Sequence, residues 1–107
     1  MKVSIDRPAG STHPDFGWKY PINYGFVVGT KAPDGEPIDA YVLGVTEPLT
    51  QFSGRVVAIV HRLDDYDDKL VVSNQERMPD EREIRDATRF QERFFESEII
   101  LAPRVVH

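Results

Sequence analysis

The sequence contains no cysteine and no long hydrophobic run. Without cysteine, a disulfide framework, a thiol nucleophile and a thiolate zinc site are all excluded, and packing alone must stabilise the fold. No stretch approaches the roughly 20 apolar residues of a membrane span, and the first residues lack the apolar run of a signal peptide. We therefore expect a cytoplasmic protein with no membrane partner.

Positive charge is also scarce, with 13 lysines and arginines against 18 aspartates and glutamates, a formal net charge of −5. Proteins that bind duplex nucleic acid gain most of their affinity by neutralising phosphates. Single-stranded nucleic acid needs a basic groove with stacking aromatic residues, which the acidic segment described below disfavours. We therefore expect no nucleic-acid partner.

The length of 107 residues, 40% of them hydrophobic, suits one domain over residues 1–107. Segments rich in β-branched and aromatic residues predict five strands, at 2–5, 24–30, 38–45, 55–63 and 69–73. The turn residues between them favour antiparallel neighbours. The front of the chain is therefore predicted to form a meander or a small barrel.

The end of the chain has a helical period. Between residues 79 and 97, Ile84, Ala87, Phe90 and Phe94 recur at helical spacing, with charged residues on the other face. This pattern predicts one amphipathic helix that packs on the sheet through this stripe, followed by a short strand at 98–101. An exposed, phenylalanine-bearing helix also favours a homo-oligomer, because association would bury that apolar area.

Negative charge is concentrated between residues 34 and 68, which hold eight carboxylates and two arginines. Seven of the eight lie in two clusters, at 34–39 and 64–68, each at the end of a predicted strand. If the fold brings these ends together, a positive group must separate the like charges. Mg²⁺ prefers oxygen ligands and is usually held by a few carboxylates together with substrate phosphates. The alternative is that the clusters are ordinary turns and solvated loops.

Possible phosphate-binding groups lie close by in the sequence. The segment 20–25 carries Tyr20 and Tyr24, and Lys69 directly follows the second acidic cluster. Lys69 is interpreted either as a phosphate donor or as half of a surface ion pair. The tyrosines are interpreted either as ligand-binding residues or as core residues with hydroxyls at the rim.

In their order and spacing, these residues of segment 20–72 resemble the magnesium-dependent, single-barrel family of soluble inorganic pyrophosphatases. The resemblance implies a mainly β fold, a five-stranded OB-like antiparallel barrel with one C-terminal amphipathic helix packed on it. It also implies hydrolysis of diphosphate to two phosphates with Mg²⁺, Mn²⁺ being the alternative cation. The metal ligands and catalytic carboxylates that it implies are Asp34, Asp39, Asp67, one of Asp64 or Asp65, and Glu36, which stands where the family has a water-activating aspartate. It further implies phosphate contacts for Tyr24 and Lys69, with Tyr20 at the edge of the site.

The chain departs from this family between its first strand and Tyr20, where typical members carry further charged site residues. The Tyr-Lys pair of the family corresponds here to Glu98 and Ile99, and Asp6 aligns weakly with the family's first glutamate. We hypothesise that Arg7 and Arg62 bind the substrate in place of the missing residues. Further candidates are His13, Lys19 and His61.

Two functions therefore stay open at the level of sequence. The first is Mg²⁺-dependent hydrolysis of inorganic diphosphate, a small phosphate-containing substrate. The alternative is a catalytically weak or inactive relative that binds a metal-phosphate ligand or a protein partner. The extra methylene of Glu36 motivates this alternative, because a displacement of about 1 Å can cost roughly 100-fold in rate.

Overall fold

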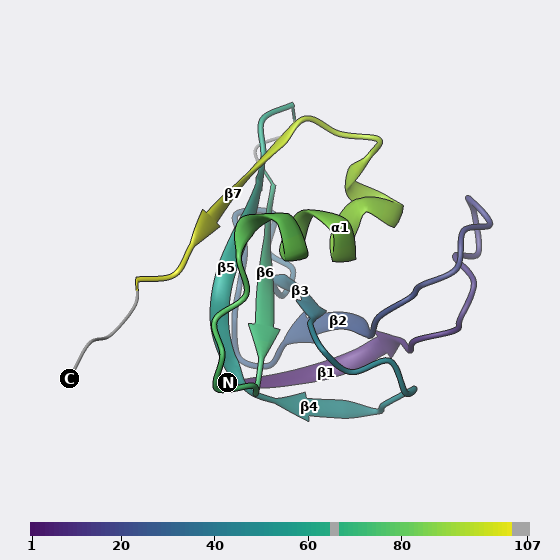
Figure 1. Cartoon of the computed structure of the whole chain (residues 1–107). Helices are drawn as coiled ribbons and strands as arrows, with labels where there is room; N and C mark the ends of the chain where they lie inside the picture. The colour runs from purple at the N-terminus through teal and green to yellow at the C-terminus, as the bar shows by residue number, and fades with distance from the viewer. Residues whose placement is uncertain (65–66, 104–107) are drawn as a thin grey trace.

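The computed structural model of the chain describes residues 1–64 and 67–103. In this part of the chain, seven strands form a single sheet in the order β4-β1-β2-β3-β6-β5-β7, and one helix lies against it (Figure 1). The elements are β1 Lys2–Arg7, β2 Tyr24–Val27, β3 Asp39–Val42, β4 Gln51–Ser53, β5 Arg55–Arg62, β6 Asp68–Ser73, α1 Glu81–Glu92 and β7 Ser97–Leu101. The prediction of a mainly β fold with one C-terminal helix is confirmed.

Most strand pairs are antiparallel, as predicted, but β3 and β6 run parallel to each other. The expectation of antiparallel neighbours throughout was therefore wrong at the centre of the sheet. A parallel pair requires a long crossover connection, and β4 and β5 lie within this one. Figure 1 shows β1 and β4 running across the direction of β5 and β6, so the sheet is strongly twisted.

The sheet has two more strands than the predicted five-stranded barrel. One is β7, predicted as a short returning strand, and the other is β4, which the sequence analysis missed. β4 has three residues, and only Phe52 among them is buried. Its backbone pairs with β1, where Phe52 lies opposite Val3. Such a short segment carries too few residues to show a period.

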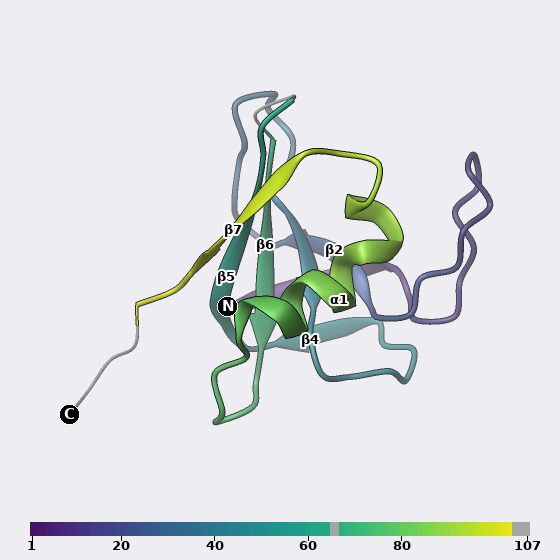
Figure 2. The ribbon, with the colours of Figure 1, turned by 45° about the horizontal axis from the view of Figure 1, so that its top comes forward.

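Helix α1 begins after Asp80, whose side chain accepts a hydrogen bond from the Glu83 N–H at 2.9 Å. Figure 2 shows the helix lying across one face of the sheet, over β5 and β6. The prediction that an apolar face of the helix packs on the sheet is correct for Ile84, which is buried, and for Ala87 and Phe90, which pack against the core. It was wrong for Phe94, which follows the helix and is 56% exposed.

The last turns of the helix bury polar side chains instead of Phe94, namely Thr88, Gln91 and Glu92. Buried polar groups need hydrogen-bond partners, and these have them. Thr88 donates to the Ile84 carbonyl at 2.9 Å, and Gln91 donates to the Tyr41 hydroxyl at 2.9 Å. The helix therefore covers a polar end of the sheet as well as an apolar centre.

The central strands β3 and β6 are buried on both faces. Tyr41 and Val71 point into the core beneath α1, whereas Ala40, Val42 and Val72 belong to a second core on the opposite face. This alternation follows the two-residue period of a strand. Because β3 and β6 run in the same direction, their first residues lie at the same edge of the sheet.

Candidate functional site

The parallel pairing of β3 and β6 brings the two acidic clusters together. Ala40 of β3 lies opposite Leu70 of β6, so the preceding residues, Asp39 and Lys69, are also neighbours. The Lys69 ammonium donates to Asp39 Oδ2 at 2.5 Å and to Asp67 Oδ2 at 2.7 Å. Residues from the first and second clusters thus meet around one lysine.

A cavity of about 480 Å³ opens at this edge, and we call it the carboxylate cavity. Its five carboxylates are Asp6, Asp34, Glu36, Asp39 and Asp67. Four of them are predicted metal-binding or catalytic residues, and Asp6 is the residue that aligned weakly with the family. The first cluster and Asp67 of the second therefore face a shared space rather than opposite sides of the molecule.

A turn at Pro33, Asp34 and Gly35 positions two of these carboxylates. Asp34 Oδ1 accepts a hydrogen bond from the Glu36 N–H at 2.9 Å, and the Ala32 N–H donates to the Glu36 carbonyl at 2.7 Å. Gly35 has a φ of +88°, a conformation that side-chain-bearing residues rarely adopt. The turn holds both Asp34 and Glu36 at the cavity.

Lys69 is 6% exposed and is held by charged partners. Burial on its own would lower the pKa of its ammonium, but the hydrogen bonds that it donates to Asp39 and Asp67 outweigh burial and raise this pKa above its ordinary value. Lys69 is therefore a permanent cation at the rim of an acidic cavity.

The oxygen donors of the carboxylate cavity suit a hard divalent cation. Within residues 1–64 and 67–103, however, no three acidic or histidine side chains converge closely enough to hold a metal ion as they stand. Asp39 and Asp67 each form an ion pair with Lys69. The donor chemistry fits a metal, and a cation in this cavity would share these two carboxylates with Lys69.

A second cavity of about 290 Å³ adjoins the first, and we call it the cation cavity. It shares Asp6 with the carboxylate cavity. All five residues predicted to bind substrate line it, namely Arg7, Tyr20, Tyr24, Arg62 and Lys69. His13, a further predicted candidate, also lines it. Gln91 and the aromatic residues Phe16, Trp18 and Phe95 line it as well, although the sequence analysis did not predict them to bind substrate.

Two other candidate cations lie elsewhere. In the described part of the chain, neither Lys19 nor His61 lines the carboxylate cavity or the cation cavity. His61 Nδ1 lies 2.5 Å from Asp68 Oδ1, and the hydrogen bond to this carboxylate raises the pKa of the imidazole. His61 thus pairs with its cross-strand neighbour on β6.

Arg62 is held in place by a buried ion pair. Its guanidinium donates to both carboxylate oxygens of Glu92, from Nε at 3.0 Å and from Nη2 at 2.8 Å. The Tyr41 hydroxyl donates to the same carboxylate at 2.5 Å, and the Phe95 ring lies 3.8 Å from the guanidinium carbon. This two-point pairing fixes both the position and the plane of the guanidinium.

The two tyrosines of the segment 20–25 remain protonated at neutral pH. Burial raises the pKa of the Tyr24 phenol well above its ordinary value, and the nearby Asp39 carboxylate raises it further. Burial also raises the pKa of Tyr20. Each phenol therefore keeps a proton that it can donate.

Asp64 is not brought into the carboxylate cavity. Its Oδ2 accepts a hydrogen bond from the Glu96 N–H at 3.3 Å, on the side of the connection that leads to β7. Asp65, the other predicted ligand from this cluster, lies outside the described residues. Asp67 is thus the residue of this cluster that the structure shows at the cavity.

Asn23, between the two tyrosines, has a structural role that the sequence analysis missed. It is fully buried, and its Oδ1 accepts from the N–H groups of Ala9 and Leu49, each at 3.0 Å. Its Nδ2 donates to the carbonyls of Val45 and Glu47 at 3.3 and 2.8 Å. One side chain therefore ties the segment that holds the tyrosines to two other loops.

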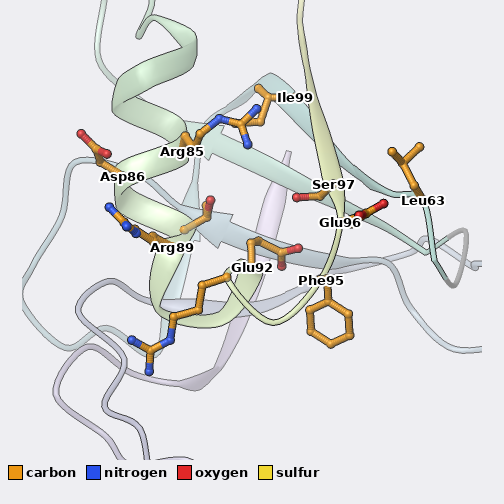
Figure 3. A pocket seen from close by; sticks show the side chains of 11 residues that line it. Leu63, Arg85, Asp86, Arg89, Glu92, Phe95, Glu96, Ser97 and Ile99 are labelled. Carbon is orange, nitrogen blue, oxygen red and sulfur yellow. The ribbon is translucent and has the colours of Figure 1, made fainter.

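A larger cavity of about 670 Å³ lies between α1 and β7 (Figure 3). Figure 3 shows Arg85 extending from the helix toward Ile99 of β7, while Glu92 and Phe95 stand at the lower end. In the described residues this cavity has none of the five carboxylates of the carboxylate cavity. The metal site and the substrate site predicted from the sequence therefore correspond to the carboxylate cavity and the cation cavity.

Comparison with known proteins agrees with these features. The model of the family "Inorganic pyrophosphatase" matches residues 5–100. An inorganic pyrophosphatase of Helicobacter pylori is 33% identical over 79 residues, which cover 66% of this chain and 46% of that protein. One from Ralstonia nicotianae is 40% identical over 47 residues, 40% of this chain and 27% of that protein. The matched part thus spans less than half the length of these relatives.

Solved structures share the fold. An inorganic pyrophosphatase of Helicobacter pylori matches with a TM-score of 0.67 at 18% identity, over 94% of this chain and 84% of that one. One from Neisseria gonorrhoeae matches with a TM-score of 0.65 at 22% identity, over 84% of this chain and 70% of that one. The predicted OB-like barrel with a C-terminal helix is confirmed by this likeness. In the described residues, the single helix is too short to cross a membrane.

Proposed function

Because the chain belongs to the inorganic pyrophosphatase family, we propose that it hydrolyses inorganic diphosphate to two phosphates with Mg²⁺ as its cofactor. The observation that carries this proposal is the junction of the carboxylate cavity with the cation cavity at Asp6. Oxygen ligands for a divalent cation thus stand directly beside arginine and lysine donors for a phosphate. No feature of the described residues favours the alternative of a catalytically inactive relative over that of an enzyme.

The residues that would hold Mg²⁺, with Mn²⁺ as the alternative, are Asp34, Glu36, Asp39 and Asp67. Members of this family generally depend on metal, and all four residues line one cavity. When bound, the cation supplies positive charge that neutralises the phosphates and acidifies a coordinated water. Asp6 borders this cavity, and burial raises the pKa of its carboxyl group.

The diphosphate would lie in the cation cavity. Arg7, Arg62 and Lys69 supply positive charge there, and the protonated phenol of Tyr24 supplies a neutral donor. Lys69 belongs to both parts of the site, since its ammonium contacts Asp39 and Asp67 while it lines the cation cavity. This arrangement positions one phosphate group beside the carboxylates, where hydrolysis takes place.

Glu36 is the residue that we assign as the general base. Its carboxylate lines the carboxylate cavity, and the turn at Asp34 fixes its backbone. It would accept a proton from the attacking water as the oxygen bonds to phosphorus. The bridging P–O bond then breaks, and the bridging oxygen leaves with the second phosphate.

We also place this reaction in the cytoplasm, because a chain without cysteine suits a reducing compartment.

The test is a phosphate-release assay on inorganic diphosphate, with Mg²⁺ and with a chelator. We expect turnover with Mg²⁺, none with the chelator, and a loss of about 100-fold or more in Asp39→Asn, because that carboxylate serves both the cation and Lys69. The matched control is Asp86→Asn, an exposed carboxylate of α1, which should retain the activity of the unmodified protein. Absence of turnover with Mg²⁺, or full activity in Asp39→Asn, would overturn the proposal.

A further inference from the structure

A fourth cavity, of about 580 Å³, adjoins the cation cavity, and we call it the aromatic cavity. Its lining is mostly apolar and consists of Phe16, Gly17, Trp18, Arg93, Phe94 and Phe95. Phe16, Trp18 and Phe95 line the cation cavity as well. The proposed phosphate site therefore opens directly onto an aromatic surface.

Three rings of this cavity form a stack. The ring centroids of Phe16 and Trp18 are 5.1 Å apart with an interplanar angle of 11°, and those of Trp18 and Phe94 are 5.3 Å apart at 20°. The two outer residues are unusually accessible for phenylalanines, with Phe16 71% exposed and Phe94 56% exposed. Trp18 thus sits between two phenylalanine rings that are both largely exposed to solvent.

Arg93 extends this surface. Its guanidinium carbon lies 4.8 Å from the centroid of the Phe94 ring, in the geometry of a cation–π contact. A planar guanidinium also stacks on aromatic bases. The aromatic cavity therefore offers both kinds of surface on which a flat, polar ring binds in water.

The hairpin that carries Phe16 and Trp18 has its own backbone hydrogen bonds. His13 N–H donates to the Trp18 carbonyl at 2.8 Å, and Tyr20 and Ser11 pair through the Tyr20 N–H at 2.9 Å. Figure 1 shows this connection between β1 and β2 projecting beyond the sheet. The two rings are therefore presented by a paired backbone that is anchored next to the cation cavity.

Inorganic diphosphate leaves these features unused, because it is small, fully charged and has no ring. We propose, building on the proposed function, that the enzyme also takes nucleoside diphosphates, with the base stacked in the aromatic cavity and the diphosphate group in the cation cavity. Water adds to the terminal phosphorus and the bridging P–O bond breaks. The products are a nucleoside monophosphate, which keeps the bridging oxygen, and phosphate, while the proton from water passes to Glu36.

The first test compares the steady-state kinetics of phosphate release from inorganic diphosphate and from adenosine diphosphate. In Phe94→Ala we expect the KM for adenosine diphosphate to rise about 10-fold, the usual loss when one base–aromatic stack is removed. The KM for inorganic diphosphate should change less than about 2-fold. Leu101→Ala, an exposed apolar residue of β7, is the matched control and should alter neither value.

The outcomes separate this inference from the proposed function. Hydrolysis of inorganic diphosphate without hydrolysis of adenosine diphosphate would overturn the inference and leave the proposed function standing. The same holds if Phe94→Ala changes both KM values equally. Loss of both activities in Asp39→Asn, with both retained in the unmodified protein, would support one shared site.

A binding measurement covers the case in which neither compound is hydrolysed. Trp18 is the single tryptophan of the chain, so its fluorescence reports on the aromatic cavity. We expect adenosine diphosphate to quench it and Phe94→Ala to weaken this binding about 10-fold, whereas inorganic diphosphate quenches little. Absence of quenching would overturn the inference. So would a dimer that Phe94→Ala converts to a monomer, because a second copy of the chain would then cover the aromatic cavity.

Discussion

Lys69 Nζ lies 2.5 Å from Asp39 Oδ2, although the two residues are 30 positions apart in the sequence. The parallel pairing of β3 with β6 produces this contact, because it places the beginnings of the two strands side by side. The same lysine also contacts Asp67. One fixed cation therefore joins the carboxylate cavity to the cation cavity.

The first prediction concerns this lysine. Lys69→Met should lower kcat/KM for diphosphate by roughly 10- to 100-fold, because charge-assisted hydrogen bonds are worth about 1.5–3 kcal/mol. The dependence on Mg²⁺ should persist, since the carboxylates remain. Lys69→Arg keeps the charge and should recover part of the loss. Unchanged kinetics in Lys69→Met would show that this lysine does not contact the substrate.

The second prediction concerns the buried pair of Arg62 and Glu92, whose side chains are each 7% exposed. Glu92→Leu should lower the free energy of unfolding by about 3–5 kcal/mol, because it removes the carboxylate that pairs with the buried guanidinium of Arg62. Replacing both residues, as in Arg62→Met with Glu92→Leu, should recover much of this loss. Urea denaturation of the single and double variants measures the coupling, and a coupling near zero would contradict the account.

The third prediction concerns Asn23. Asn23→Ala should lower the free energy of unfolding by about 3 kcal/mol or more, because the buried N–H of Ala9 and the half-buried N–H of Leu49 lose their acceptor. Asn74→Ala changes the same residue type at an exposed position and should stay within about 0.5 kcal/mol. Thermal unfolding followed by circular dichroism compares the two. Equal midpoints would mean that Asn23 does not hold the loops.

The fourth prediction concerns pH and the exposed pair of Glu83 and Arg77. Two hydrogen bonds of 2.7 Å from the Arg77 guanidinium lower the pKa of the Glu83 carboxyl. A carboxyl whose pKa is lower in the folded state adds stability above its unfolded pKa. That stability is lost as the pH falls through the lowered pKa. In Arg77→Ala, the pKa of Glu83 measured by NMR titration should therefore rise, and an unchanged value would contradict the pairing.

The sequence predicted most strands and the acidic clusters because these depend on local patterns. Runs of β-branched and other apolar residues mark β5 and β6, and Pro33, Asp34 and Gly35 form the turn that their residue types favour. It did not predict that β3 and β6 run parallel. Strand direction depends on the path of the intervening chain, which no short window of sequence contains.

The end of the helix shows a second limit. Spacing favoured Phe94 as a core residue, yet Glu92 is buried there because Arg62 and Tyr41 offer it three hydrogen bonds. Those partners come from distant strands, so the compensation for burying a charge is invisible in the helix sequence alone. The exposed Phe94 then becomes part of the aromatic cavity, a surface that the sequence analysis had assigned to packing.

The most direct test of the central claim, that the carboxylate cavity binds the catalytic cation, is a Mn²⁺ titration followed by electron paramagnetic resonance. The comparison uses two aspartates three residues apart, of which Asp67 lines the cavity and Asp64 accepts a hydrogen bond from the backbone of Glu96 instead. The account predicts that Asp67→Asn weakens Mn²⁺ binding about 10-fold or more and that Asp64→Asn leaves it unchanged. Equal affinities in the unmodified protein and Asp67→Asn, or a larger loss in Asp64→Asn, would contradict it.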